Sequence, residues 1–265
     1  AKRALEYNPK NTACLTFTDG EENEVVKKLG KEQSFIFKNE FKDGFISIRS
    51  KILTYALLYK AFSGDESFAK KLRTEGSYTV EINKMGVLPA WSQIMHYNII
   101  YGSYGEPVAR DVESTMIEGG IASVQFCDYK NFCHGRFVFG NNHCANKKVK
   151  KTDVCTVLLI SPREELLAKQ VRELALPVNM PVVEIRTEFD NPIASIQLLI
   201  DALTFVIDLA EKQLGINPNS PPNYSSINKQ VPRDGVKFVR ELSRFGELHY
   251  GDVKPKPLAK KSEKV

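Results

Sequence analysis

Short apolar runs alternate with amphipathic stretches along most of the chain. Residues 97–101 and 154–160 are almost continuously apolar, which is typical of strands covered on both faces of a sheet. Residues 163–176 and 193–214 repeat apolar positions at helical spacing, and Gly215 predicts the end of the second helix. Strands and helices that alternate with short connections predict a parallel sheet in an α/β protein.

The rest of the chain gives shorter elements. We expect a helix end at 1–7, strands at 13–18 and 34–37, helices at 21–29, 45–62 and 66–73, a strand at 78–82, a further strand at 182–185 and a short helix at 235–245. The strand at 78–82 is expected at a sheet edge. Trp91, the only tryptophan, is interpreted as a packing residue that joins this connector to the following part of the chain.

The stretch 97–136 combines these elements with candidate chemistry. A strand at 97–101 leads through a glycine-containing turn into a helix whose first turn holds Pro107, where proline is well tolerated. That helix ends at Gly119, and a second strand follows at 121–126. A turn of this kind is the usual place for an anionic ligand in an open parallel sheet. The candidate ligand-binding residues of the turn are Gly102, Ser103 and Gly105.

Acidic residues on this helix and a histidine beyond it are candidate proton-transfer groups. Asp111 and Glu118 are seven residues apart and share one helix face. His134 lies in the loop after the next strand, and such loops gather at the carboxyl ends of parallel strands. A carboxylate and an imidazole that meet over one ligand can move protons near neutral pH.

Other charged residues of the stretch have two interpretations. Asp111 and Glu113 are candidates for ligand binding, but acids in the first helical turns are also favoured by the helix dipole. Arg136 or Lys130 could pair with a phosphate, or be solvated charges.

These residues resemble the SIS (sugar isomerase) domain family. The match is to the second SIS domain in the isomerase half of glutamine–fructose-6-phosphate aminotransferases, with Pro107 at the helix start, Glu118 in the place of the proton-shuttling glutamate, and His134-Gly135 in the place of the ring-opening His-Gly. Residues 157–167 resemble the next strand and helix of the family. The loop 128–136 is closer still to that of bacterial two-SIS proteins.

The resemblance implies a three-layer αβα sandwich with a parallel, doubly wound sheet. The expected organisation is the C-terminal half of a first SIS repeat at 1–64, a connector at 65–94, a second SIS domain at 95–215, and a basic, partly disordered tail at 216–265. The Ser/Thr-rich phosphate loop that would open a complete first repeat is not in this sequence. In the family the tail brings a lysine to the sugar, and here Lys229 reaches that position only after a three-residue shift.

For function, the resemblance implies a protein that binds a phosphorylated sugar or another carbohydrate derivative. As an enzyme it would be an aldose–ketose sugar-phosphate isomerase, or an aminosugar-phosphate isomerase or deaminase, with Glu118 moving the proton and His134 opening the ring. Family sites form between subunits or repeats, so a homodimer is expected, and the chemistry requires no redox cofactor or metal. The alternative is a non-catalytic module that senses a phosphosugar or a nucleotide and signals to a partner protein.

Composition changes this picture little. The chain has 265 residues, of which 42% are hydrophobic and 26% charged, as in an ordinary globular protein. The sequence shows neither a signal peptide nor a run of about 20 apolar residues, so a cytoplasmic location is expected. Of the net charge of +5, residues 254–265 contribute +4 from five lysines and one glutamate, which disfavours a nucleic-acid-binding surface.

The five cysteines are odd in number, which predicts reduced thiols. A zinc site is a weak alternative, because the candidate ligands lack paired C-x-x-C spacing. These candidates are Cys127, Cys133, His134, His143 and Cys144.

Overall fold

The computed structural model describes residues 14–16, 27, 34–36, 48–81, 91–145, 153–176 and 180–217, apart from a few side chains within these ranges. All of them belong to the first of two compact units, Ala1–Pro221. The helices predicted at 1–7 and 235–245, the predicted tail with Lys229, and nearly all of the helix predicted at 21–29 lie outside the described residues.

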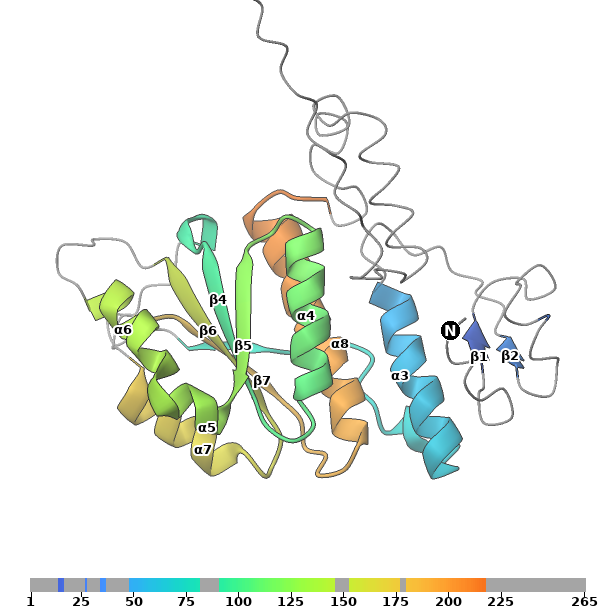
Figure 1. The fold of residues 1–265 in the computed structure, drawn as a ribbon. Helices are drawn as coiled ribbons and strands as arrows, with labels where there is room; N and C mark the ends of the chain where they lie inside the picture. The colour runs from blue at the N-terminus through green and yellow to red at the C-terminus, as the bar shows by residue number, and fades with distance from the viewer. Residues whose placement is uncertain are drawn as a thin grey trace, which may run out of the picture. The chain divides into compact units, whose positions relative to one another are not determined.

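A five-stranded sheet forms the centre of the described part (Figure 1). In spatial order its strands are β3 (Thr79–Glu81), β7 (Val182–Arg186), β6 (Val154–Ile160), β4 (His96–Tyr101) and β5 (Ser123–Asp128). The last four are parallel to one another, and β3 pairs antiparallel with β7. The predictions of a parallel sheet and of an edge strand near residue 80 are therefore confirmed.

Helices cover both faces of the sheet (Figure 1). On one face lie α4 (Glu106–Glu118) and α8 (Ile193–Asp208), and on the other lie α5 (Tyr129–Asn131), α6 (Phe137–Ala145) and α7 (Glu165–Gln170). Successive residues of β4 face opposite sides, so Ile99 packs with α4 and α8, whereas Ile100 packs with α7. All seven residues of β6 are buried. The described part of the chain is thus an α/β sandwich, while the repeat organisation of an SIS protein stays a prediction.

The order of the strands creates a crevice between β4 and β6. From β4 the chain crosses through α4 to β5, and from β6 it crosses through α7 to β7 on the opposite side of the sheet. Connections that leave two neighbouring strands in opposite directions form a crevice at the carboxyl ends of those strands, where open α/β sheets bind ligands. Residues 102–105 and 161–164 follow these two strand ends.

The N-terminal elements match the sequence pattern where they are described. β1 (Cys14–Thr16) and β2 (Ser34–Ile36) form a parallel pair. The long helix α3 (Ile48–Ser63) packs its Tyr55 and Tyr59 near Ile196 of α8. These contacts bury one side of α3 only partly, since no residue of that helix is fully buried.

The connector after α3 is fastened to α8 by a buried carboxylate. Asp201 is fully buried and accepts hydrogen bonds from the Arg73 guanidinium at 2.8 Å and from the Ser77 backbone N–H at 2.9 Å. The helix predicted at 66–73 is only a 3-10 turn at Phe68–Lys70. Just before this turn, the Ser67 N–H donates to a side chain, the Asp65 carboxylate, which offers the backbone an alternative to a longer helix.

Helix α8 is the central helix of the core. Together with the π turn Leu209–Gln213 it is apolar and long enough to cross a membrane, but 72% of its most apolar window is buried inside the protein. The Trp91 ring lies 6.1 Å from the Phe205 ring of this helix, which confirms the interpretation of Trp91 as a packing residue. Gly215 has a φ of +64° and ends the helical segment as predicted.

Candidate functional site

The turn between β4 and α4 is tied to two neighbouring elements. Within the turn, the Gly105 N–H donates to the Gly102 carbonyl at 3.1 Å. The Ser195 hydroxyl of α8 donates to the Tyr104 carbonyl at 2.7 Å, and the Arg163 guanidinium lies 5.3 Å from the Tyr104 ring centre. The turn is therefore held in one position at the carboxyl end of β4.

The Glu164 carboxylate fills the crevice between the two strand ends. One of its oxygens accepts hydrogen bonds from the Ser103 N–H at 3.1 Å and from the Ser103 hydroxyl at 3.3 Å. The other accepts from the Ser161 N–H at 3.1 Å and from the Ser161 hydroxyl. Glu164 is only 5% exposed and Ser161 1%. The carboxylate thus occupies the position in which the sequence predicted an external anion beside Ser103.

The sequence pattern did not lead us to predict Glu164 and Ser161 as residues of the site. The spacing Ser161-x-x-Glu164 before the apolar residues 166–168 is that of a capping box, in which the glutamate side chain bonds back to the serine N–H. That signal could have located the local pair. The bonds to Ser103 join residues 61 positions apart and have no local signature.

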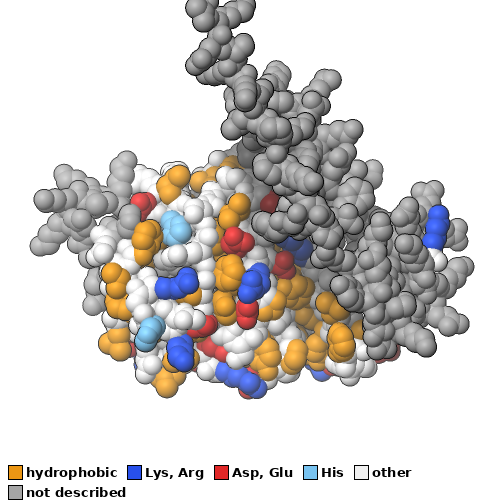
Figure 2. Space-filling model, viewed as in Figure 1, with side chains coloured by type: hydrophobic (Ala, Val, Ile, Leu, Met, Phe, Trp, Pro, Cys, Tyr) orange, Lys and Arg blue, Asp and Glu red, His pale blue; other side chains and the backbone are white. Residues whose placement is uncertain are grey.

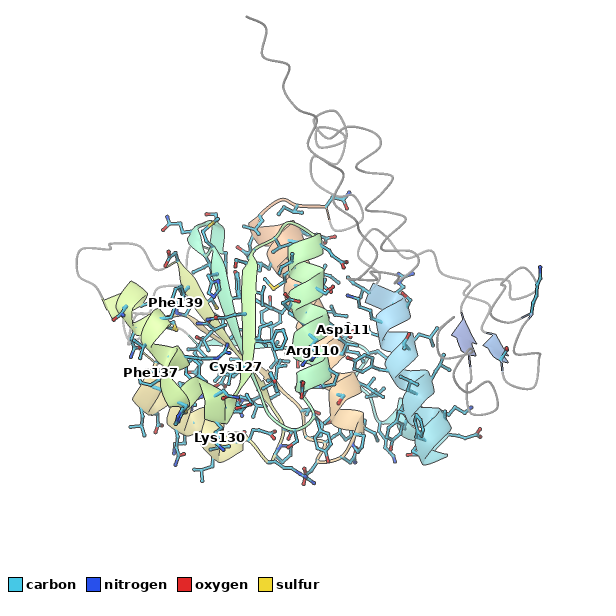
Figure 3. All side chains as sticks on the ribbon, in the orientation of Figure 1. Arg110, Asp111, Cys127, Lys130, Phe137 and Phe139 are labelled. Carbon is cyan, nitrogen blue, oxygen red and sulfur yellow. The ribbon has the colours of Figure 1, made fainter. Side chains whose placement is uncertain are left out.

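The three acidic candidates on α4 have different surroundings. Asp111 lies on the side of α4 that faces α3 (Figure 3), and with burial its carboxylate raises the pKa of Tyr55 in α3. One turn further on, the Thr115 hydroxyl accepts a hydrogen bond from Lys51 of α3 at 2.8 Å. Glu113 is half-buried. Glu118 is exposed at the end of the helix and accepts a hydrogen bond from the Ser114 hydroxyl at 3.0 Å.

His134 lies in an exposed segment that follows β5. Asp128 caps the short helix α5, since its carboxylate accepts the Asn131 N–H at 2.7 Å, and a π turn follows at Phe132–Arg136. Within this turn Gly135 has a φ of +124°, which favours glycine, and His134 and Arg136 are exposed. The sequence interpretation expected a simple loop here, whereas the structure has helical turns that lead into α6.

The structure brings some of the predicted residues together and separates others. Gly102, Ser103, Gly105 and the turn with His134 and Arg136 all follow the carboxyl ends of β4 and β5, which are adjacent parallel strands. Glu118 ends α4, which runs back along the sheet for 13 residues, or about 20 Å at 1.5 Å per residue. Within one copy of the chain, Glu118 and His134 therefore lie toward opposite ends of the parallel strands.

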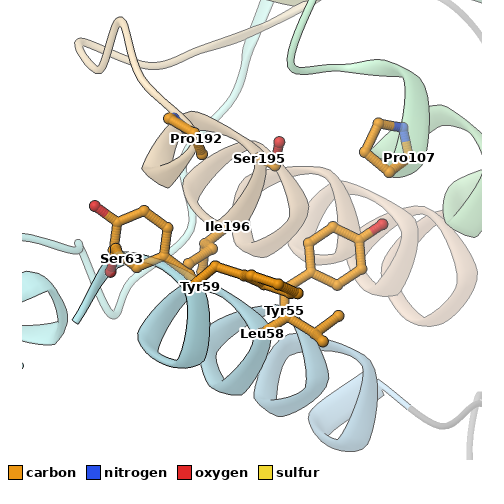
Figure 4. Close-up of a pocket in the computed structure, with 9 residues that line it drawn as sticks. Tyr55, Leu58, Tyr59, Ser63, Pro107, Pro192, Ser195 and Ile196 are labelled. Atoms are coloured by element: carbon orange, nitrogen blue, oxygen red, sulfur yellow. The ribbon is translucent and has the colours of Figure 1, made fainter. Parts of the chain in front are cut away.

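An apolar groove lies between α3, α4 and α8 (Figure 4). It has a volume of about 610 Å³. Its lining is Tyr55, Leu58, Tyr59, Phe62, Ser63, Pro107, Pro192, Ser195 and Ile196. The groove includes Pro107 of the SIS-like motif but none of the predicted polar site residues.

The cysteines described by the structure are mostly buried thiols. Burial raises the pKa of Cys127 to about 11, although the nearby Arg136 charge opposes this shift, and burial also raises the pKa of Cys144 to about 11. Cys133 is exposed. Among the described side chains, which leave out that of His143, no three His, Cys, Asp or Glu groups converge as metal ligands would.

The face shown in Figure 2 carries interspersed charges. Basic and acidic side chains alternate over the described part of that face, with hydrophobic groups between them. No continuous basic stripe is visible on this described part.

Comparisons with known proteins give only distant structural similarity. No protein-family model and no curated protein matches the sequence. A glucose-6-phosphate isomerase-like protein from Thermus thermophilus is 16% identical, with a TM-score of 0.36 over 49% of this chain and 44% of its own. A protein from Clostridium difficile, provisionally assigned as a phosphosugar isomerase, is 13% identical, with a TM-score of 0.38 over 69% of this chain and 48% of its own.

The chain spans less than half the length of each of these two proteins.

Proposed function

We propose that this protein binds a phosphorylated sugar or a related carbohydrate derivative and, assembled from at least two copies, isomerises it. Glu118 would move the proton between the two carbons of an enediol intermediate, and His134 would open the sugar ring. The observation that carries the proposal is that both SIS-like residues are solvent-exposed and stand at element ends: Glu118 ends α4, and His134 precedes Gly135 in a π turn.

The position of Glu118 supports a functional rather than a structural role. A carboxylate in the last turn of a helix opposes the helix dipole, and none of the described ion pairs involves Glu118. Its described partner is the Ser114 hydroxyl, one turn earlier on the same helix. The side chain is thus free to turn toward a ligand.

The separation of Glu118 from His134 supports a site shared between copies. The two residues lie toward opposite ends of the strands, separated by the roughly 20 Å length of α4, so a single ligand of sugar size cannot contact both in one copy. A second copy that brings its His134 turn to the exposed end of α4 would complete the site. Arg136 in the same turn would then supply a cation for the ligand phosphate.

The same separation favours a second candidate function. If copies do not assemble in this way, a ligand contacts either the carboxylate or the imidazole, and the proton cannot be transferred as proposed. The protein would then be a non-catalytic module that senses a phosphosugar or nucleotide. Binding and turnover must therefore be measured separately.

The test is a thermal-shift screen followed by isomerase assays. Glucosamine-6-phosphate, fructose-6-phosphate and glucose-6-phosphate are compared with fructose as the unphosphorylated control. A ligand at a hundred times its dissociation constant stabilises the protein by about 2.7 kcal/mol. We expect one phosphosugar to raise the melting temperature of wild type and of Glu118→Gln, with turnover in wild type only. Binding without turnover in wild type would point to the sensor. A folded protein that no phosphosugar stabilises would contradict both the isomerase and a phosphosugar sensor, and would leave a nucleotide as the ligand to test.

A further inference from the structure

We propose that Ser103 and Ser161 form an anion-binding cradle whose resident anion is the protein's own Glu164 carboxylate, and that an external phosphate group binds there only when this side chain is withdrawn. Four hydrogen-bond donors from two separate loops converge on the two carboxylate oxygens. Two are backbone N–H groups and two are hydroxyls, the donor types that bind phosphate at strand-to-helix turns.

The surroundings of the carboxylate indicate an anion site rather than an ion pair. All four donors are neutral, and none of the described ion pairs involves Glu164. The adjacent Arg163 is paired with Asp190 instead. The Arg163 charge still acts on Glu164 electrostatically, but it forms no ion pair with it, so this buried carboxylate depends mainly on its hydrogen bonds and the cradle supplies what hydration would supply in water.

Gly102 provides an independent observation. A Cβ atom built on Gly102 would lie 2.2 Å from the Cγ, Cδ and Oε1 atoms of Glu164. Gly102 does not have a positive φ, so the turn itself does not require glycine at this position. Glycine here is instead required by the close approach of the carboxylate, which indicates that the sequence is fitted to an occupied cradle.

If the protein binds a phosphosugar as proposed above, the cradle also limits where the phosphate of that ligand can bind. The phosphate of a sugar ligand cannot occupy the crevice of this sheet while Glu164 fills it. Two cations that the sequence offers as candidate phosphate partners are described by the structure and exposed: Lys130 in α5 and Arg136 in the His134 turn. The phosphate would therefore bind outside the Gly102–Gly105 turn.

The experiment uses inorganic phosphate as the probe. Phosphate is titrated into wild type, Glu164→Ala and the double variant Glu164→Ala/Ser161→Ala, with chloride at matched ionic strength as the control. We expect Glu164→Ala to bind phosphate at least tenfold more tightly than wild type, and the double variant to lose most of this gain. Equal phosphate affinity in wild type and a folded Glu164→Ala would overturn the inference.

Two further arms complete the test. If Glu164→Ala is unfolded in chloride, recovery of Trp91 fluorescence on adding phosphate supports the cradle, and no recovery in either salt contradicts it. Glucose-6-phosphate, titrated into the same variant, distinguishes a site for the phosphate group alone, which binds both compounds equally, from one that also contacts the sugar. Neither arm depends on phosphosugar binding by wild type, so the proposed function can fail independently.

Discussion

Replacing Gly102 with alanine places a methyl group where the Glu164 side chain lies. The new Cβ atom would be 2.2 Å from three atoms of that side chain, whereas carbon atoms in contact are about 3.5–4.0 Å apart. The least costly adjustment is for Glu164 to leave the crevice. We therefore expect Gly102→Ala to cost about as much stability as removal of the Glu164 carboxylate itself.

The magnitude follows from the burial of the donors. Ser103 is exposed, so its N–H and hydroxyl can bond to water when the carboxylate leaves. Ser161 is buried, and its N–H and hydroxyl each lose a charged acceptor, at about 1.5 kcal/mol apiece. The expected loss is roughly 3 kcal/mol, or about 6–12 °C in melting temperature for a domain of this size.

A double-mutant cycle isolates this effect. Urea unfolding, followed by the fluorescence of Trp91, gives the free energy of unfolding for Gly102→Ala, Glu164→Ala and the double variant. We expect Gly102→Ala to be neutral, or stabilising by up to about 1 kcal/mol, once residue 164 is alanine. Gly140→Ala is the matched control, because its Cβ meets the Met180 methyl group at 2.4 Å in α6, outside this turn, and its cost should add to that of Glu164→Ala.

A cost of Gly102→Ala that is unchanged in the Glu164→Ala background would refute this reasoning. So would a Gly102→Ala protein as stable as wild type. In either case the carboxylate would not be what requires glycine at position 102.

Three further predictions concern other parts of the fold. Asp201→Ala should lower the free energy of unfolding by about 2–4 kcal/mol, because Arg73 and Ser77 of the connector lose their buried hydrogen-bond acceptor. Trypsin should then cleave faster at Arg73, and an unchanged cleavage rate would argue that Asp201 does not hold the connector in place. Cys133 should react fastest with Ellman's reagent near pH 8, because it is exposed while burial raises the pKa values of the other described cysteines, and Cys133→Ser should lose one fast thiol. Burial and the Asp208 carboxylate raise the pKa of Tyr78 from 10.0 to about 12. The stabilisation that this shift gives the folded protein is therefore present below pH 10 and is lost as the pH rises through 12. Tyr78→Phe should flatten the dependence of the free energy of unfolding on pH between 10 and 12, and an identical profile in the variant would contradict the assignment.

Local signals predicted the main elements because each is encoded within a few residues. Pro107 indicated the first turn of a helix and Gly119 its end, and the structure has this helix at Glu106–Glu118. The apolar run at 154–160 is a strand buried along its whole length, as its lack of alternation indicated. Elements with clear periodicity and clear end signals could thus be located from the sequence alone.

The missed features depend on contacts between distant residues. Helix α6 contains Gly140 and two asparagines, which are poor helix formers. Tertiary packing favours it nevertheless, since a Cβ on Gly140 would lie 2.4 Å from the Met180 methyl group, so the chain segments approach closely here. In the same way, no local pattern indicates that Asp201 of α8 binds the connector, and only the fold shows this contact.

The candidate site was predicted in part for a related reason. The turn at 102–105 was located correctly, but its anion is supplied by Glu164 from another loop. Spacing on α4 placed Asp111 and Glu118 on one face, yet could not show that this face meets α3 at Asp111. Nor could it show that α4 carries Glu118 away from the strand ends where His134 lies.

The most direct test of the shared site mixes two inactive variants. Glu118→Gln and His134→Ala are each expected to abolish isomerase activity while folding normally. If one copy supplies the carboxylate and another the imidazole, dissociating and reassociating an equal mixture should restore activity to about a quarter of wild type, because half of the dimers are mixed and each holds one intact site of two. A mixture as inactive as its parts, with mixed dimers shown to form, would contradict the claim that the two residues act on one ligand from different copies.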